Sequence, residues 1–314
     1  MVDVKRFVDC LRTAGIGCFA GVPDSLLKNF CAYLTDTTGG RHVITANEGG
    51  AVGLAAGHYL STGEMACVYM QNSGQGNAVN PLASLADPDV YSIPMLLVIG
   101  WRGMPGVHDE PQHVKQGKVT LQLFETLGIP VSVIPDTGWE EVVGRAARQA
   151  LSERRPAALV VKKGLFAEYA LRNRQPDIAD LPRERAIERL LDELPGKSVI
   201  VSTTGMISRE VYEVRERLTI QQSNNPAIQQ CHSHDFLTVG SMGHASMIAL
   251  GIAQAQPKRP VVCLDGDGAS IMQMGNMAIV GQSGCKNLTH IVLNNAAHDS
   301  VGGQPTVGGA IDLK

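Results

Sequence analysis

The chain has 314 residues, a length that suits two domains of roughly 150 residues each. Its 27 basic and 30 acidic residues leave a net charge of −3, which argues against the strongly basic surface of a nucleic-acid-binding protein. Hydrophobic residues make up 44% and charged residues 18%, and no apolar run approaches the ~18 residues of a membrane span. The composition therefore excludes a disordered chain and gives no sign of a membrane-spanning one.

The first half of the chain alternates strand-like and helix-like segments. It starts with an amphipathic helix rather than a signal peptide, because Val4, Phe7, Val8 and Leu11 recur at helical spacing. The strands expected after it are 17–22, 42–45, 65–70, 93–100, 131–134 and 157–161, and the clearest helices are 47–60 and 138–151. Strands that alternate with helices predict a parallel sheet covered on both faces.

A second alternation follows a charged, proline-broken stretch that is typical of a linker. Its expected helices are 184–194 and 244–254, and its expected strands are 198–202, 236–239, 261–264 and 290–293. The fold class predicted is α/β, with two consecutive doubly wound parallel-sheet domains at 1–168 and 184–314, joined by a linker at 169–183. Because the second half has fewer strands and 302–314 is expected to be a loop, we expect its C-terminal elements to be missing or supplied by a partner.

The seven cysteines show no CxxC motif, which favours reduced thiols in a cytoplasmic protein. The cluster formed by Cys231, His232, His234 and Asp235 resembles a metal site at first sight. Its spacing fits none of the familiar zinc patterns and it lacks a fourth ligand of the right kind. We therefore expect no zinc there.

The strongest motif joins two strand ends in the second half. Strand 261–264 runs into Gly266-Asp267-Gly268, and strand 290–293 ends in Asn294, 27 residues after Asp267. In a parallel βαβ unit these ends are neighbours, so a carboxylate and an amide oxygen can reach one hard cation such as Mg²⁺, which shares its shell with phosphates. The glycines allow close backbone approach, and the following helix N-terminus favours an anion. A dinucleotide site fits poorly, because Ile271 stands where its third glycine belongs.

This GDG…NN block resembles the diphosphate-binding signature of thiamine diphosphate enzymes. The resemblance implies that Asp267, Asn294 and the main-chain carbonyl of Ala296 bind Mg²⁺. The same family resemblance implies that residues of both halves hold the cofactor: Glu48, Gly266, Asp267, Gly268, Ala269 and Asn294. The segment 72–77 follows the third strand and is expected near the cofactor or the substrate, with Asn72, Ser73 and Gly74 as the candidate cofactor contacts. The segment 298–300 follows the metal-binding asparagine, but the sequence does not establish whether it lies near the diphosphate.

The same family implies a catalytic glutamate where the second strand of a pyrimidine-binding domain meets a helix. Glu48 follows strand 42–45 and opens a helix of small residues. In that place it would hydrogen-bond the aminopyrimidine ring and help to activate the thiazolium ring of the cofactor. Taken alone, Glu48 is better explained as a helix N-terminal acid that interacts with the helix dipole. The motif in the second half shifts the balance to the cofactor role.

Several longer blocks narrow the resemblance. The segments GVPDSLLKNFCAYL, DEPQHVKQG, VGSMGHAS and LNNAAHDSVGGQPT look like the phosphonopyruvate decarboxylase family, to which sulfopyruvate decarboxylases are close. That family implies decarboxylation of 3-phosphonopyruvate to phosphonoacetaldehyde and CO₂ in phosphonate and antibiotic biosynthesis. It implies thiamine diphosphate and Mg²⁺ as cofactors and no nucleic-acid or membrane partner. It also implies at least a homodimer, in which Glu48 and Asp267 of one chain serve different sites. Two alternatives stay open: sulfopyruvate as substrate, or a non-catalytic cofactor-binding subunit.

The substrate is expected at loops that follow the first-half strands. A phosphonate dianion needs cationic or N–H groups. The candidates are Asp24, Ser25 and Lys28 at a helix start after the first strand, and His113 and Lys115 after the fourth. His113 is the first choice for proton transfer, and Lys115 is a candidate phosphonate contact. Capping by Asp24 and ordinary loop roles for the others are the competing explanations.

Overall fold

The computed structural model describes residues 1–173, 181–221 and 235–313 of the chain. Its contacts divide the chain into two compact units. The first unit is Met1–Arg174 with Val301–Gln304, and the second is Gln175–Ser300 with Pro305–Lys314. Residues 174–180 of the predicted linker and residues 231–234 of the zinc-like cluster lie outside the described residues.

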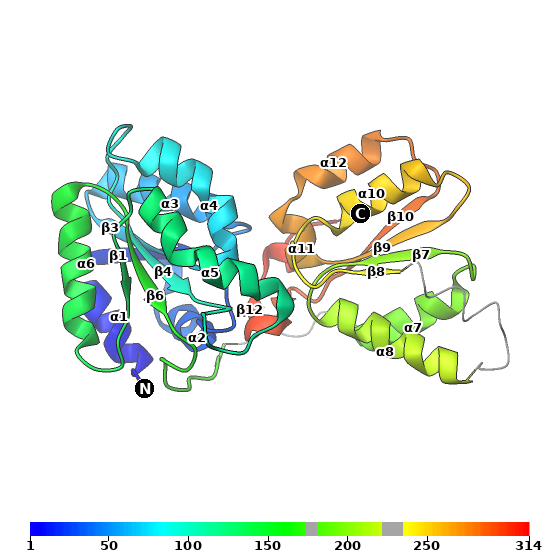
Figure 1. Cartoon of the computed structure of the whole chain (residues 1–314), viewed down its shortest axis with the longest axis horizontal. Coiled ribbons are helices and arrows are strands. Elements are labelled where there is room, and N and C mark those ends of the chain that lie inside the picture. Colours follow the sequence, from blue (N-terminus) through cyan, green and yellow to red (C-terminus); the bar gives the residue numbers. More distant parts are fainter. Residues whose placement is uncertain (174–180, 222–234, 314) are drawn as a thin grey trace. The chain divides into compact units, whose positions relative to one another are not determined.

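The first unit contains a parallel sheet with the strand order β2-β1-β3-β4-β6-β5. Its strands are β1 (Ile16–Gly21), β2 (His42–Ile44), β3 (Met65–Gln71), β4 (Leu96–Gly100), β5 (Val131–Val133) and β6 (Ala157–Val161). Its helices are α1 (Val4–Thr13), α2 (Lys28–Thr37), α3 (Glu48–Thr62), α4 (Gln75–Pro81), α5 (Pro111–Thr126) and α6 (Trp139–Glu153). Helices cover both faces of this sheet (Figure 1).

The central strand β3 shows why this sheet forms. Its side chains alternate between two buried clusters because successive residues of a strand point to opposite faces. Cys67 and Tyr69 join the cluster that holds α1, α2 and α6. Ala66, Val68 and Met70 join the cluster that holds α3, α4 and α5. A strand buried on both faces needs a continuous apolar run, so the doubly wound α/β prediction is confirmed.

The second unit repeats the plan with a parallel sheet in the order β10-β9-β7-β8. Its strands are β7 (Val199–Ser202), β8 (Phe236–Leu237), β9 (Val261–Gly266) and β10 (Leu288–Leu293). Its helices are α7 (Arg183–Glu193), α8 (Met206–Gln221), α10 (Ala245–Ala255), α11 (Asp267–Met272) and α12 (Gly275–Gln282). Buried clusters with α7 and α8 on one face and with α10 on the other show that this sheet is also covered on both sides.

The end of the chain departs from the expected loop. Residues Ala297–His298 (β11) and Gln304–Pro305 (β12) pair as a small two-stranded sheet, and Val307–Gly309 forms a 3₁₀ turn. Two-residue strands leave no periodic pattern for a sequence reading to detect, so the four predicted strands of the second half were incomplete.

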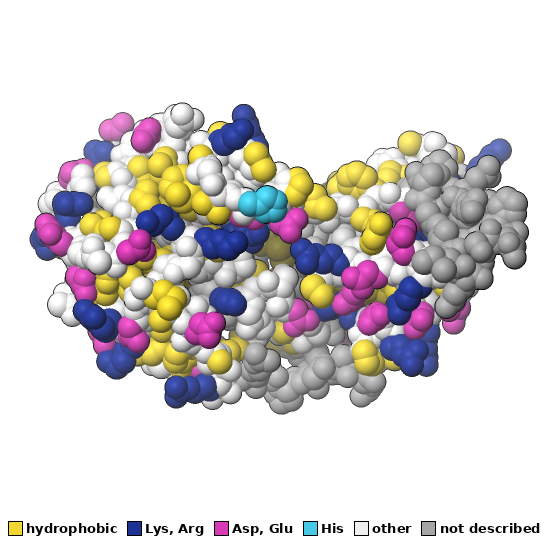
Figure 2. All heavy atoms as spheres, turned by 60° about the horizontal axis from the view of Figure 1, so that its bottom comes forward, with side chains coloured by type: hydrophobic (Ala, Val, Ile, Leu, Met, Phe, Trp, Pro, Cys, Tyr) yellow, Lys and Arg dark blue, Asp and Glu magenta, His cyan; other side chains and the backbone are white. Residues whose placement is uncertain are grey.

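The described surface carries charges of both signs. Figure 2 shows Lys and Arg side chains interspersed with Asp and Glu over the face that it presents. Such mixing on this face agrees with the small net charge of −3. Within the described residues, no helix combines the length and the apolar character needed to span a membrane.

Candidate active site

Two neighbouring strand ends frame a cleft in the second unit. β9 ends at Gly266 and α11 begins at Asp267, while β10 ends at Leu293 and Asn294 follows. Leu293 and Gly266 are partners in the parallel register, so Asp267 and Asn294 leave the sheet side by side. The cleft is lined by this glycine-rich turn, by the start of α8 and by residues 297–300.

Asp267 and Asn294 bring oxygen donors to one point of the second unit. Asp267 is 2% exposed, and its carboxylate accepts a hydrogen bond from the Thr306 hydroxyl. Asn294 Nδ2 donates to the Gly308 carbonyl over 2.6 Å. A Cβ added at Gly308 would clash with Asp267 Oδ2 and would lie 2.8 Å from Asn294 Oδ1. The carboxylate and amide oxygens therefore converge on the same small space.

Ala296 completes a tight turn beside this point. Its φ of 55° lies in the left-handed region, its N–H donates to Asn294 Oδ1 over 3.0 Å, and its carbonyl accepts from the Thr306 N–H over 2.9 Å. Carboxylate, amide and carbonyl oxygens are the donors that Mg²⁺ prefers. Burial raises the pKa of the Asp267 carboxyl, with the Thr306 hydrogen bond acting in the opposite direction. Because a divalent cation would favour the ionised form of this buried acid, the residues present fit a Mg²⁺ ion.

The rest of the cleft offers groups that suit an anion. A Cβ at Gly268 would lie only 3.0 Å from His298 Cε1, so glycine keeps the floor of the cleft open. Thr203 is 3% exposed, and its hydroxyl has no hydrogen-bond partner among the described residues. Burial lowers the pKa of His298 to about 4, so the ring is neutral at physiological pH. With the N-terminus of α8 at the same wall, these groups fit the diphosphate of a cofactor.

The positive charge of Arg183, which lines this cleft, is balanced by two carboxylates. Arg183 donates to both carboxylate oxygens of Glu210 over 2.8 Å and to Asp299 Oδ2 over 2.8 Å. These hydrogen bonds, led by the one with Glu210, raise the pKa of Arg183 above its ordinary value. Two carboxylates around one guanidinium leave no net positive charge, so a metal ion at the Asp267 position would be the chief group to neutralise a bound diphosphate.

In the first unit, Glu48 is the first residue of α3, and its side chain is buried and hydrogen-bonded. The side chain of Asn47 caps the helix by accepting from the Gly50 N–H over 2.8 Å, which leaves Glu48 free for other contacts. Glu48 is 4% exposed, and its Oε2 accepts from Asn77 Nδ2 over 2.7 Å. A Cβ at Gly74 would clash with the Glu48 carboxylate. Burial raises the pKa of Glu48, so the structure favours a carboxyl that holds its proton.

A polar network joins the loops that follow β1 and β4. Arg102 donates from Nε to Asp109 Oδ2 over 2.8 Å and from Nη2 to Asp109 Oδ1, and its Nη1 donates to Ser25 Oγ over 2.7 Å. The hydrogen bonds from Arg102 hold the pKa of Asp109 well below its usual range. Because Asp109 balances its charge, Arg102 serves to orient Ser25 and the loop rather than to supply a free cation.

Asp24 is completely buried beneath this network. Its carboxylate accepts from Gln71 Nε2 over 2.6 Å and from the Leu26 N–H over 2.9 Å, and burial raises its pKa. The expectation of a helix that opens at Asp24 and Ser25 is wrong: α2 begins at Lys28. The physical reason is that Asp24 closes a turn over residues 24–27 with its side chain, so the helix starts after that turn. A direct substrate contact by Asp24 stays a prediction.

The remaining substrate candidates differ in their exposure. Lys28 and Lys115 are exposed, whereas His113 is half-buried with its Nδ1 unpartnered among the described residues. Burial, reinforced by the nearby Arg102 charge, lowers the pKa of His113. His113 and Lys115 lie in α5 and not in a loop, because Pro111 at the first helical position sets the backbone for a helix there. Their roles in catalysis and phosphonate binding stay predictions.

The predicted cofactor contacts after β3 are used inside the first unit. Asn72 is fully buried and donates from Nδ2 to the Arg102 carbonyl and to Thr120 Oγ1, each over 2.8 Å. Ser73 is exposed and donates to Gln71 Oε1 over 2.6 Å. Asn72 thus braces the loop after β3 against its neighbours, and a cofactor contact by either side chain stays a prediction.

Sequence reasoning missed several residues of these sites. Thr306 contacts the Asp267 carboxylate, Arg102 organises the loops of the first unit, and Gly308 shapes the metal position. Asn77 belongs to the segment 72–77 expected near the cofactor or the substrate, but its contact with Glu48 was not predicted. Arg102 had a usable signal, since it is a cation directly after a buried strand end. The other three contact partners 14 to 39 residues away in sequence, and no local pattern marks such pairs.

Comparisons with known proteins agree with this arrangement. The sequence profile of the thiamine pyrophosphate enzyme N-terminal TPP binding domain matches residues 4–123, and that of the C-terminal TPP binding domain matches residues 218–312. The chain is therefore a thiamine diphosphate enzyme, and thiamine diphosphate is its cofactor.

Relatives that align with nearly all of this chain indicate which group of thiamine diphosphate enzymes it belongs to. A phosphonopyruvate decarboxylase of Streptomyces viridochromogenes is 37% identical, with 100% of this chain and 78% of the relative covered. A phosphonopyruvate decarboxylase of Streptomyces hygroscopicus gives the same identity and coverage. A sulfopyruvate decarboxylase of Methanosarcina acetivorans is 25% identical over 96% of this chain and 78% of the relative. The chain belongs to the family of thiamine diphosphate-dependent decarboxylases that includes the phosphonopyruvate decarboxylases, which are carbon–carbon lyases.

Proposed function

We propose that the protein catalyses the Mg²⁺-dependent decarboxylation of 3-phosphonopyruvate to phosphonoacetaldehyde and CO₂. The observation that carries the proposal is the convergence of the Asp267 carboxylate and the Asn294 amide oxygen at two parallel strand tips. The choice of substrate is supported by the 37% identity to two phosphonopyruvate decarboxylases over the whole of this chain.

At the metal, Asp267, Asn294 and the carbonyl of Ala296 would hold Mg²⁺, and the glycines at 266 and 268 would let the diphosphate approach the main chain. Thiamine diphosphate supplies, when bound, the carbon nucleophile and the electron sink for the electrons released as CO₂ leaves. The Thr203 hydroxyl and the start of α8 would orient the diphosphate through hydrogen bonds. Among the described residues that line the cleft, the one cationic side chain, Arg183, is already balanced by two carboxylates, so these hydrogen bonds would position the cofactor without added net positive charge.

Glu48 would hold a proton at its carboxyl group and donate it to a ring nitrogen of the cofactor. This role is supported by its burial, its raised pKa and its hydrogen bond from Asn77, which orients the carboxyl group. A carboxyl whose pKa is raised by burial keeps its proton to a higher pH than an exposed glutamate and is therefore the better proton donor.

For the substrate, a phosphonate dianion requires positive charge that Arg102 cannot supply alone, because Asp109 neutralises it. The exposed amines of Lys28 and Lys115 are therefore the proposed phosphonate contacts, and Ser25 is a proposed hydrogen-bond donor held in place by Arg102. His113 is proposed to transfer the proton that the product needs at the former 2-keto carbon, in place of the departing carboxylate.

The proposal has a cellular and an oligomeric side. We place the protein in the cytoplasm, in phosphonate and antibiotic biosynthesis, and as at least a homodimer in which the cofactor bridges two subunits. The six described cysteines are all free thiols, which supports a reducing compartment. Light scattering that finds a fully active monomer would contradict the shared site.

The test supplies the purified protein with Mg²⁺, thiamine diphosphate and 3-phosphonopyruvate and measures CO₂ together with the aldehyde. Release of both, lost on omission of either cofactor and in Asp267→Asn, supports the proposal. Binding of both cofactors without turnover of 3-phosphonopyruvate or sulfopyruvate would identify a non-catalytic subunit instead. A second candidate substrate is sulfopyruvate, favoured by the 25% identical relative. A sulfonate carries one negative charge where a phosphonate carries nearly two, so the ratio of kcat/KM for the two acids decides between them.

A further inference from the structure

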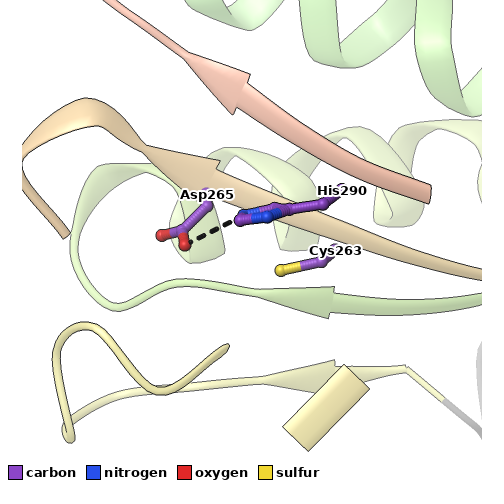
Figure 3. Close-up of side chains that lie close together, drawn as sticks. All are labelled: Cys263, Asp265 and His290. Atoms are coloured by element: carbon purple, nitrogen blue, oxygen red, sulfur yellow. Dashed lines mark hydrogen bonds and ion pairs between the residues drawn. The ribbon is translucent and has the colours of Figure 1, made fainter. Parts of the chain in front are cut away.

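Beneath the metal position, β9 and β10 share a buried polar contact that the function described so far does not use. Figure 3 shows Asp265 and His290 pointing toward one another, with Cys263 beside them. His290 Nε2 lies 3.2 Å from Asp265 Oδ2, and Asp265 Oδ1 accepts from the Gly266 N–H over 3.0 Å. Asp265 is 1% exposed, so the carboxylate depends on these partners.

The contact runs diagonally between the two strands. In the parallel register His290 is opposite Cys263, and Asp265 is opposite Val292. The imidazole of His290 therefore extends from the level of Cys263 to that of Asp265, two residues further along the neighbouring strand β9. A diagonal contact of this kind is lost if one strand slides or twists against the other, so it reports on their alignment and restrains it.

The position of this pair is what matters for function. Asp265 stands two residues before Asp267, and His290 stands four residues before Asn294. One oxygen of Asp265 also holds the N–H of Gly266, the residue that joins strand to turn. Each partner thus sits directly below one of the two strand tips that carry the proposed metal ligands. Mg²⁺ requires near-ideal octahedral geometry, so small changes in the spacing of these tips affect its affinity.

We propose that the Asp265–His290 pair is a positioning element for the metal site: it aligns the ends of β9 and β10 so that Asp267 and Asn294 present their oxygens at the spacing Mg²⁺ requires. The inference rests on the Mg²⁺ site proposed above. Among the described residues that line the cleft, neither Asp265 nor His290 is present, so the pair is proposed to act through the ligands rather than in the chemistry.

A metal ion held by Cys263, Asp265 and His290 themselves is the competing explanation, since their ligand atoms all lie within 4.8 Å of one another. Two observations favour the pair. Structural zinc sites use four protein ligands, and the described residues group only these three. The carboxylate already accepts two hydrogen bonds without a metal, and burial raises the pKa of the Cys263 thiol to a value at which it stays protonated.

The test measures Mg²⁺ affinity by calorimetry in the presence of thiamine diphosphate and without substrate. His290→Leu removes the contact, and His290→Gln keeps an N–H at about the reach of Nε2. Ile291→Val is the matched control, since it trims a partly buried residue of the same strand that packs in the cluster with α7 and α8. We expect His290→Leu to weaken Mg²⁺ binding about 10- to 100-fold, with affinity restored in His290→Gln and unchanged in Ile291→Val even if its Tm falls.

Several results would overturn the proposal. Unchanged Mg²⁺ affinity in His290→Leu with a lowered Tm would make the pair a stabilising contact only. About one zinc per chain in the purified protein, absent from Cys263→Ala, would make the cluster a metal centre. If His290→Leu does not fold, Asp265→Asn replaces it in the same comparison. Failure of the wild-type protein to bind Mg²⁺ with thiamine diphosphate would refute the proposed function instead, so the two failures are distinguishable.

Discussion

The replacement Glu48→Gln tests the first unit most directly. Glutamine keeps the size of the side chain and an oxygen that can accept from Asn77 Nδ2, which lies 2.7 Å from the carboxylate in the wild-type chain. It cannot hold and release a proton. A positioned proton donor contributes about 10²- to 10⁴-fold to a reaction, which corresponds to about 3–5 kcal/mol of the barrier. We therefore expect kcat for CO₂ release to fall by that factor, while thiamine diphosphate binding is largely kept.

The stability of the same variant has a defined sign. The folded chain raises the pKa of Glu48 above its ordinary value because the side chain is buried. Below the ordinary pKa of about 4.3, Glu48 is protonated in both the folded and the unfolded chain and does not affect the free energy of unfolding. Above that pH the folded chain binds more protons than the unfolded chain, so wild-type stability falls as the pH rises through the folded pKa. Glutamine removes this penalty. The Tm of Glu48→Gln at pH 7 should equal or exceed that of the wild type, and the difference should vanish near pH 4.

The control is Glu141→Gln, which changes an exposed glutamate in the first turn of α6. If Glu48 only interacted with the dipole of its helix, the two variants would behave alike, with small changes in Tm and no change in turnover. Undiminished CO₂ release by Glu48→Gln would refute its catalytic role. A large loss of Tm at pH 7 would contradict the raised pKa of the buried acid on which that role depends.

Three further predictions follow from the geometry. Gly74→Ala should lower kcat at least tenfold, because its Cβ would displace the Glu48 carboxylate. Gly76→Ala is the control and should keep its activity, because a Cβ there meets nothing within 4 Å. Equal kcat values for the two variants would contradict the prediction. Asp267→Asn should weaken Mg²⁺ binding at least tenfold by calorimetry while the Tm of the metal-free protein at pH 7 is unchanged or higher, since burial raises the pKa of this carboxyl. Asp109→Asn should lower Tm at pH 7, because the depressed pKa of Asp109 stabilises the folded chain. The difference from wild type should start to shrink as the pH falls below the ordinary pKa of about 3.9 and should be lost only as the pH falls through the depressed folded pKa. A difference independent of pH would show that the ion pair with Arg102 is not its source.

Much of this protein was determined by local sequence. The alternation of apolar strands and helices specified both sheets, since a strand buried on two faces must be apolar along its whole length. The sequence also predicted the two strand ends that carry Asp267 and Asn294, and the helix that begins at Glu48. The reason is that parallel topology places such strand ends at one edge of a sheet.

Tertiary structure alone decided which groups surround these residues. Asn77, Gly74 and Gly308 come to the key carboxylates from distant parts of the chain, and the diagonal contact of Asp265 with His290 depends on how two strands are aligned. Burial, and with it the raised pKa of Glu48, likewise follows from packing. The reason is physical: sequence periodicity reports which face of an element is buried, whereas the neighbours of one side chain depend on contacts between elements that no local pattern encodes.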